Sequence, residues 1–446
     1  MSSPRATDRA YHPDAMTRMA QGLRKSFSAL EERNFRYLWL GQTGSAIGDG
    51  LSFVAIAFAV LAIGGSATEI GIVFAAFFLP NVVFLLAGGV WADRLPRNLV
   101  MMTSDGVRAA VQVGLAVLMF SGRAEVWHIV VAAALHGTAQ AFFVPAATGL
   151  MPQVVSAGRL QQANALMTLS KSAAFLIGPA VSGILVAASG PGIVFAIDAV
   201  TYLFSMLTLA LLRIDRAVAT AVRESFASEL AQGWHEVRSR DWLLGSLIVF
   251  GLSNMAMGSF MVLGPVIVDR ELGGAAEWGL IMTVGALGAL IGGAVALRWK
   301  PARPLAVGFA LMLVGATRTL SLIPPLPVLV IALTAMLTLV AISISNTLWE
   351  TVLQQRIPQA SLSRVSSYDW MVSLAFQPVA FVIIGPLADT IGEVPTLLLA
   401  SAIALGVNIG ALLVPSIRNM RRLDTDAPLD QPDEVSRPVT TGSNVP

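Results

Sequence analysis

The chain of 446 residues contains no cysteine, so it has no disulfide bonds and no thiolate ligands for a metal ion. Charged residues are scarce at 13% of the chain, whereas about a quarter is usual in soluble domains. The net charge is only +2 and the charges lie between apolar blocks, which gives no support for nucleic-acid binding. The four histidines, His12, His128, His136 and His235, are scattered, so we expect no metal site and no cofactor.

Hydrophobic residues make up 55% of the chain and are gathered in long runs. Each run is long enough to cross a bilayer core of about 30 Å. We therefore expect an all-α membrane protein with twelve transmembrane helices. Their ranges are 36–63, 70–92, 99–121, 126–149, 163–188, 192–213, 242–268, 276–298, 304–323, 327–351, 363–388 and 394–415.

Two parts of the chain resemble each other, which predicts two pseudo-symmetric halves. A shift of 202 residues places Gly183 and Gly190 on Gly385 and Gly392. A shift of 208 residues places Ala67 and its neighbours on residues 275–279. The predicted units are a cytoplasmic tail (1–34), a six-helix half (35–213), a linker with an amphipathic helix (214–241), a second six-helix half (242–415) and a disordered tail (416–446).

Lysine and arginine are distributed unequally between the two sides of the predicted spans. The side of the N-terminus collects most of them, and the other side holds only Arg123 and Arg270. Three more, Arg108, Lys171 and Arg318, fall inside spans. The positive-inside rule therefore places both termini in the cytoplasm of a multi-pass protein in a bacterial cytoplasmic membrane.

A short hydrophilic interruption at 88–98 separates the second and third predicted spans. It contains the string Gly-x-x-x-Asp-Arg, formed here by Gly89, Asp93 and Arg94 and followed by Arg97. Between two apolar runs of about 20 residues, this string resembles the loop signature of the major facilitator superfamily. The segment 34–42, the segment 45–49 and the Gly-Pro pair at 178–179 resemble the drug:proton antiporter branch that contains macrolide-efflux and siderophore-export proteins. The loop departs from the family pattern at Pro96 and Asn98.

The resemblance implies that the two halves rock around a site at the middle of the membrane, braced by a cytoplasmic gate. We assign to this gate Gly89, Asp93, Arg94, Arg97, Asp105 and Arg108. Asp105 and Arg108 lie three residues apart and are predicted to pair on one helix face. The alternative for this pair is a purely structural role.

Asp49 lies about fourteen residues inside the first predicted span. With Gln42, Ser45 and Ser52, at spacings of three and four, it forms one polar stripe. A charge there is costly, about 2.5–3.5 kcal/mol even on lenient scales, so we expect Asp49 to take up a proton during transport. A permanently hydrogen-bonded structural role is the alternative. The fourth span has His136 and Gln140 but lacks the arginine that many proton antiporters of the family carry, which leaves the coupling ion open.

Two further carboxylates are candidates for proton coupling, Glu350 and Asp369, although Glu350 is close enough to a span end for an interfacial role. The family's first, fourth, seventh and tenth helices line the cavity. The predicted substrate cavity is therefore built from Gln42, Phe53, His136, Gln140, Phe143, Asn254, Met257, Phe260, Asn346 and Trp349. Aromatic, methionine and amide groups suit an amphipathic, cationic organic molecule. For Met257 and Phe260, simple packing between helices is an equal alternative.

The function expected from these observations is proton-coupled efflux of small amphipathic organic molecules, by a monomer in the lipid bilayer. A siderophore exporter or a lysolipid flippase of the same fold remains an alternative. A membrane-embedded enzyme is the alternative of a different class, but the chain has no phosphate-binding loop and no clustered catalytic residues.

Overall fold

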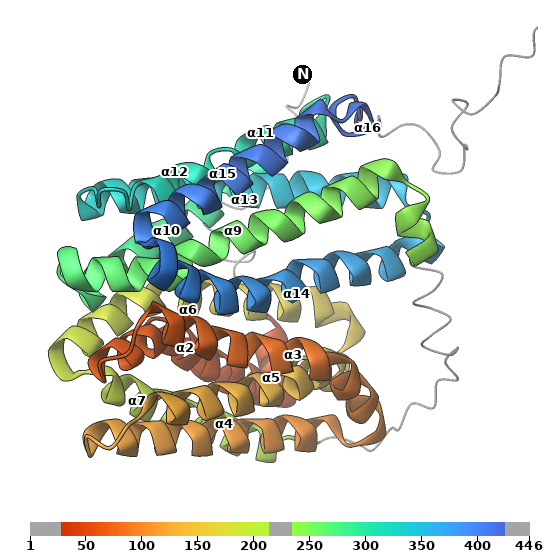
Figure 1. The fold of residues 1–446 in the computed structure, drawn as a ribbon. Coiled ribbons are helices and arrows are strands. Elements are labelled where there is room, and N and C mark those ends of the chain that lie inside the picture. Colours follow the sequence, from red (N-terminus) through yellow and green to blue (C-terminus); the bar gives the residue numbers. More distant parts are fainter. Residues whose placement is uncertain (1–27, 214–233, 424–446) are drawn as a thin grey trace, which may run out of the picture.

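The computed structural model describes residues 28–213 and 234–423, which fold into two stacked bundles of helices (Figure 1). The first bundle contains α2 (Arg33–Ala62), α3 (Ala67–Arg94), α4 (Arg97–Phe120), α5 (Val126–Val154), α6 (Leu160–Ser189) and α7 (Pro191–Ala210). The second contains α9 (Asp241–Glu271), α10 (Ala275–Ala296), α11 (Pro304–Met312), α12 (Gly315–Leu320), α13 (Val328–Arg356), α14 (Gln359–Ile391) and α15 (Glu393–Leu413). Short elements are η1 (Ser28–Glu31), η2 (Ala157–Arg159) and α16 (Pro415–Arg418).

Each predicted span falls on helical residues, which confirms the all-α fold class. The span predicted at 304–323 is interrupted between α11 and α12, where the Leu313 and Val314 amides bond three residues back instead of four. Within the described residues, nine helices are long and apolar enough to cross a membrane. Helix α4 is not among them, and it carries Asp105 and Arg108 near its middle. The exact count of twelve therefore stays a prediction.

The hydrophilic interruption near residue 95 is shorter than the sequence suggested. Helix α3 continues to Arg94 and α4 begins at Arg97, so the turn consists of Leu95 and Pro96. Proline has no amide hydrogen to donate and is therefore well suited to the residue that precedes a helix.

The two bundles meet through two equivalent helix pairs, α3 with α14 and α6 with α10. Gly183 on α6 abuts the backbone of Ala275, and Gly385 on α14 abuts the backbone of Thr68. A Cβ at either glycine would overlap these backbone atoms. Because the predicted repeat also matches Gly183 to Gly385, the repeat in the sequence corresponds to two symmetric contacts between the bundles.

Gly190 and Gly392, the other matched glycines, are each the single residue between two helices. Their φ angles are 74° and 93°, a left-handed region in which a side chain is disfavoured. The same sharp turn therefore follows α6 in one bundle and α14 in the other.

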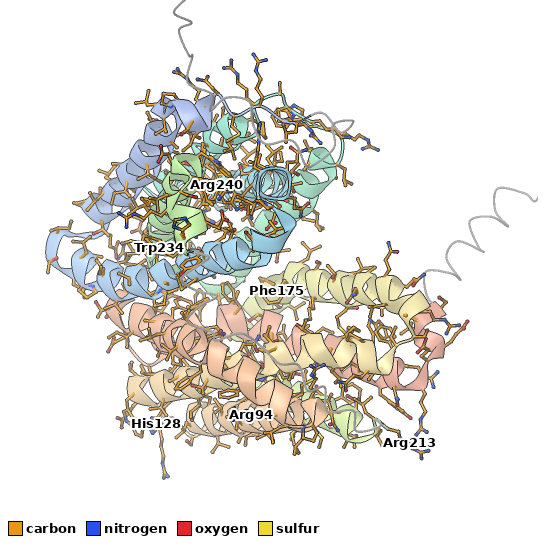
Figure 2. All side chains as sticks on the ribbon, turned by 90° about the vertical axis from the view of Figure 1, so that its right-hand side faces the viewer. Arg94, His128, Phe175, Arg213, Trp234 and Arg240 are labelled. Carbon is orange, nitrogen blue, oxygen red and sulfur yellow. The ribbon has the colours of Figure 1, made fainter. Side chains whose placement is uncertain are left out.

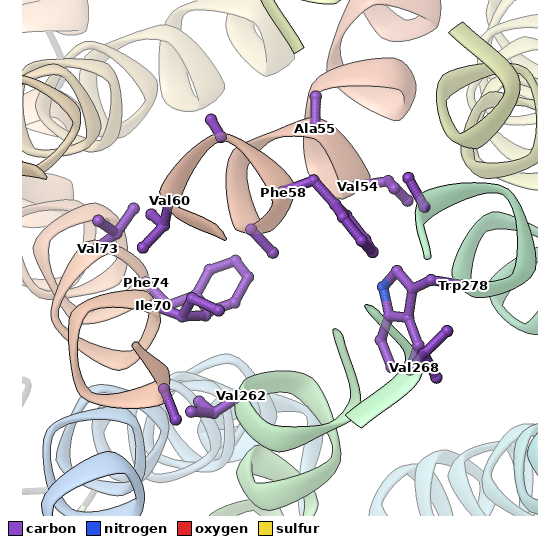
Figure 3. Packing of buried hydrophobic residues seen from close by; sticks show 14 of the residues in the cluster. Val54, Ala55, Phe58, Val60, Ile70, Val73, Phe74, Val262, Val268 and Trp278 are labelled. Carbon is purple, nitrogen blue, oxygen red and sulfur yellow. The ribbon is translucent and has the colours of Figure 1, made fainter. Parts of the chain in front are cut away.

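A hydrophobic cluster closes the bundles at one end (Figure 3). Side chains of α2 and α3, such as Phe58 and Phe74, meet those of α9 and α10, such as Val262 and Trp278. Thr68 also donates a hydrogen bond of 2.5 Å to Asp389 across the boundary. These contacts lie at the end of the loops at 63–66 and 272–274, which the positive-inside rule predicts to be external.

Part of the predicted amphipathic linker is described. Residues 234–238 are helical, and Val237 is fully buried against the second bundle. Glu236 accepts hydrogen bonds from Arg240 and from Ser361 on α14. The rest of the linker, residues 214–233, and the tail from 424 onward lie outside the described residues.

Candidate functional site

A cavity of about 340 Å³ lies within the first bundle. Helices α2, α4, α5 and α6 line it, and it reaches from Asp49 toward residues such as Leu38 and Met151 near the opposite end from the hydrophobic closure. Its apolar surface includes Phe143 and Phe175, and its polar surface includes amide and hydroxyl groups. This combination suits an organic ligand with both apolar and polar parts.

Three charged side chains line this cavity: Asp49, Arg108 and Lys171. Arg108 is almost fully buried and forms an ion pair of 2.6 Å with Asp105, the pairing expected from their spacing. Its guanidinium also donates to Gln140 at 2.9 Å and lies 4.1 Å from the centre of the Phe143 ring. Arg108 is therefore held rigidly at the cavity wall by both charge and aromatic contacts.

Asp49 is the carboxylate at the inner end of the cavity, and 28% of its side chain is exposed. It accepts a hydrogen bond from the hydroxyl of Tyr202 on α7. The same hydroxyl lies 3.2 Å from Nε2 of His136, which is itself 3.9 Å from Asp49. Asp49, Tyr202 and His136 thus form a connected polar group in which the tyrosine hydroxyl can donate to either neighbour.

The structure adds a polar stripe on α6 that sequence reasoning mostly missed. Asn164, Thr168, Lys171 and Phe175 all line the cavity. Their spacings of four, three and four residues place them on one helix face, a signal that could have been found in the sequence. Figure 2 shows Phe175 at the boundary between the two bundles. Among the described residues, Lys171 has no hydrogen bond and no ion pair.

Four of the predicted residues in the first half are brought together at this cavity: Gln42, Asp49, Gln140 and Phe143. Gln42 is buried, and its Nε2 has no hydrogen-bond partner among the described residues. A buried donor without a partner is costly unless a ligand or water satisfies it.

Two other predicted residues of this half lie outside the cavity lining. His136 lies next to Asp49 but does not line the cavity, and the centre of its ring is 5.5 Å from the centre of the Phe77 ring. Phe53 is half-buried beside Phe74, which in turn contacts Phe381 of the second bundle. Phe53 therefore lies next to the contact between the bundles.

The predicted residues of α9 do not join this cavity. Met257 lines a separate cavity of about 30 Å³ inside the second bundle, large enough for about one water molecule. Asn254 is half-buried on the same helix. Phe260 is fully buried, packed against Trp278 and beneath the guanidinium of Arg318 at 4.3 Å. Phe260 therefore packs between helices in this conformation, and its role in a substrate cavity stays a prediction.

The predicted residues of α13 and α14 are also separate. Trp349 is buried among aromatic side chains, and its indole donates a hydrogen bond of 2.8 Å to Asp369. Asn346 and Glu350 are exposed on the surface of α13. In this conformation the Trp349 ring packs within a hydrophobic cluster of the second bundle, and its place in a substrate cavity stays a prediction.

The gate residues are only partly described. Arg94 is exposed at the end of α3, and Arg97 donates from the start of α4 to the Gly149 carbonyl on α5. Gly89 falls within α3, and the side chain of Asp93 lies outside the described part of the chain. The gate role stays a prediction. Arg108, which we assigned to the gate, also lines the cavity because α4 turns it toward α5.

Among the side chains that the structure describes, no group of three or more histidine, aspartate or glutamate residues is arranged to hold a metal ion. The chemistry of the cavity is that of hydrogen bonds, one carboxylate and two cations.

Comparison with known proteins finds similar sequences along most of the chain. The chain is 27% identical over 405 residues to the multidrug efflux pump Tap of Mycobacterium tuberculosis, covering 87% of this chain and 94% of that protein. It is 24% identical over 396 residues to macrolide efflux protein A of Streptococcus pyogenes, covering 87% and 97%.

Solved structures show the same fold at low sequence identity. The nucleoside transporter NupG superposes with a TM-score of 0.67 at 11% identity, covering 84% of this chain and 98% of that one. A bacterial homologue of the iron transporter ferroportin in an inward-facing state gives 0.63 at 17% identity, covering 84% and 98%. The sequence profile of the Major Facilitator Superfamily matches residues 38–374. The chain therefore belongs to the major facilitator superfamily of membrane transporters.

Proposed function

We propose that this transporter is a proton-coupled exporter of small amphipathic organic molecules. The observation that carries the proposal is the cavity in the first bundle, where the carboxylate of Asp49 faces an apolar and amide-rich space. The names of its relatives, a multidrug efflux pump and a macrolide efflux protein, agree with such a substrate.

The chemistry of coupling follows from the position of Asp49. As an anion at the inner end of the cavity it attracts the cationic part of a substrate, and Tyr202 stabilises the charge by donating a hydrogen bond. Once protonated, Asp49 no longer attracts the cation, and the substrate is released. Proton and substrate thus compete for one carboxylate, which is the requirement for exchange in opposite directions.

Alternating access of the cavity to the two sides of the membrane sets the direction of transport. The hydrophobic closure between α3 and α14 and between α6 and α10 seals one end, while the cavity extends toward the other. If the termini are cytoplasmic, as the positive-inside rule predicts, this conformation is open to the cytoplasm. Rocking of the two bundles would then open the external end.

The experiment compares wild type with Asp49→Asn in liposomes under an imposed pH gradient, following a cationic amphipathic dye and a macrolide. We expect gradient-driven flux in wild type and its loss in the variant, with binding of the cationic dye weakened as well, because the amide carries no charge. Asp269→Asn, which changes an exposed carboxylate at the end of α9, is the matched control. Equal gradient-driven flux in wild type and Asp49→Asn would contradict the assignment.

A second candidate function, export of a siderophore or movement of a lysolipid, is favoured by one observation. Lys171 presents an ammonium group without an ion-pair partner to the cavity, beside Arg108. Two cations suit a substrate that carries a carboxylate or phosphate. Lys171→Gln should abolish transport of an anionic lysolipid and leave transport of a cationic dye intact. The reverse pattern would eliminate this candidate.

A further inference from the structure

A second carboxylate lies inside the first bundle, away from the cavity. Asp198 on α7 is fully buried. Its Oδ2 accepts hydrogen bonds from Ser52 of α2 at 2.6 Å and from Gln112 of α4, and its Oδ1 accepts one from Thr201 at 3.2 Å. Three helices therefore converge on this group, and none of the cavity-lining residues contacts it through a hydrogen bond.

No cation neutralises Asp198 among the described residues. Helices α2, α4 and α6 pack against α7, and their nearby ionisable groups are Asp49, Asp105, Arg108 and Lys171. Of the two cations, Arg108 is engaged with Asp105 and Gln140, and Lys171 faces the cavity. The ionisable neighbours on α5 and α7 are His136 and Tyr202, which contact Asp49. A carboxylate buried within a membrane helix without a cation is far cheaper to hold in its neutral, protonated form.

The position of Asp198 relative to Asp49 is set by helix geometry. Ser52, its partner, follows Asp49 by three residues on α2, and Tyr202, the partner of Asp49, follows Asp198 by four residues on α7. The two carboxylates therefore lie about one helical turn apart along the same contact between α2 and α7. Gly48 permits this approach, because a Cβ there would overlap the Asp198 carboxylate.

Two negative charges one turn apart in a medium of low dielectric constant repel each other strongly, so the pair binds protons as a unit. The two members differ in access, since Asp49 opens to the cavity whereas Asp198 is sealed from it. Ionisation of Asp49 in the open cavity is thus favoured when Asp198 carries a proton.

The side-chain amide of Gln112 can form a hydrogen bond with a protonated Asp198. As assigned, its Nε2 donates to Asp198 and its Oε1 has no partner. Since oxygen and nitrogen of an amide are interchangeable by rotation, the alternative assignment places Oε1 beside Asp198. In that arrangement a protonated Asp198 donates a hydrogen bond to the amide oxygen of Gln112, and the hydroxyl of Ser52 can also donate to this oxygen.

We propose that Asp198 is a second proton-binding site, separate from the substrate cavity, which holds a proton while Asp49 is ionised and gives it up in the opposite conformation. The proposal rests on the proposed proton-coupled function for its role in transport. It assigns the substrate and one proton to different routes: the substrate passes through the cavity, and this proton passes through the interior of the first bundle.

The primary test is infrared difference spectroscopy of the purified protein in lipid, which detects the C=O stretch of protonated carboxyl groups. We expect wild type to show a carboxyl band that is lost in Asp198→Asn and retained in Asp49→Asn and in the control Asp269→Asn. If Asp198→Asn does not fold, Asp198→Glu should shift this band instead of removing it. A band unchanged in both Asp198 variants would overturn the proposal.

Transport then tests the role of the site. Under a pH gradient, Asp198→Asn should lose gradient-driven flux while keeping substrate exchange, and Asp198→Glu should restore the flux. Gradient-driven flux in Asp198→Asn equal to that of wild type would overturn the role in coupling. If wild type itself shows no gradient-driven flux, the proposed function fails, whereas loss of the infrared band in Asp198→Asn would still establish the protonated carboxyl.

Discussion

A single methyl group at Gly385 should test whether the contact between α3 and α14 belongs to only one conformation. In the structure, a Cβ at this position would overlap backbone atoms of Thr68, so the substitution Gly385→Ala forces the helices apart. Overpacking of this kind costs about 1–3 kcal/mol. The cost falls on the conformation in which the two helices touch, and it vanishes once the bundles separate at this end.

The free-energy cost that the overlap adds to one conformation sets the expected size of the shift in population. A bias of about 1–3 kcal/mol changes the ratio of two states by about 5–150-fold. Gly385→Ala should therefore deplete the conformation described here and enrich the one in which the cavity opens to the other side. Gly183→Ala, at the equivalent contact of α6 with α10, should act in the same direction.

The absence of cysteine makes the measurement direct. A single cysteine introduced at Thr168, which lines the cavity, is labelled with a membrane-impermeant maleimide from the side on which the cavity opens. We expect the labelling rate, which follows the population of the conformation described here, to fall in Gly385→Ala by a factor of up to about 5–150.

The matched control is Gly406→Ala on α15, where a Cβ would meet no atom within 4 Å. It gains the same helix propensity as the other substitutions, about 1 kcal/mol, without any overlap. An unchanged labelling rate in Gly385→Ala, or an equal fall in Gly406→Ala, would refute the reasoning.

Three further outcomes are expected. Asp105→Asn should destabilise the protein by about 3–5 kcal/mol in a detergent melting assay, because it leaves the buried Arg108 charge without its ion-pair partner; an unchanged melting temperature would contradict this. Asp369→Asn, which keeps an acceptor for the indole hydrogen bond, should change gradient-driven flux by less than twofold if Asp369 only holds Trp349 in place, whereas loss of flux would support its role in coupling. The hydrogen bond from Arg240 lowers the pKa of Glu236 in the folded protein. The ionised carboxylate therefore stabilises the linker at pH values above the pKa that Glu236 has in the unfolded chain, and this stabilisation is lost as the pH falls through its lower pKa in the folded state. Proteolysis of the linker should therefore become faster in wild type as the pH falls, and Glu236→Gln should remove this pH dependence. An identical pH profile in the variant would contradict the assignment.

Several features of the site followed from local patterns. The polar stripe containing Gln42 and Asp49 predicted one wall of the cavity, because residues three and four apart share a helix face. The same rule predicted the pair of Asp105 and Arg108. It also identifies the α6 stripe that ends at Phe175, of which the charge of Lys171 inside a span is the most conspicuous member.

Partners on other helices could not be predicted in this way. Tyr202 lies 153 residues from Asp49, and nothing in the spacing of either helix indicates that they meet. Phe260 and Trp349 have the composition expected of a ligand pocket, yet the packing of the second bundle buries both rings. Whether an aromatic side chain lines a cavity or fills a core depends on which neighbouring helix approaches it.

The sequence by itself determined that this protein is helical and built for a bilayer, since apolar runs of the right length are a local property of the chain. It also determined the two-fold repeat, because glycines matched at fixed shifts are visible without coordinates. Only the tertiary structure decided that those glycines form two equivalent contacts, that the bundles close at one end, and that the cavity lies within the first bundle. The physical reason is that periodicity fixes which face of a helix is polar, whereas packing between helices fixes what that face meets.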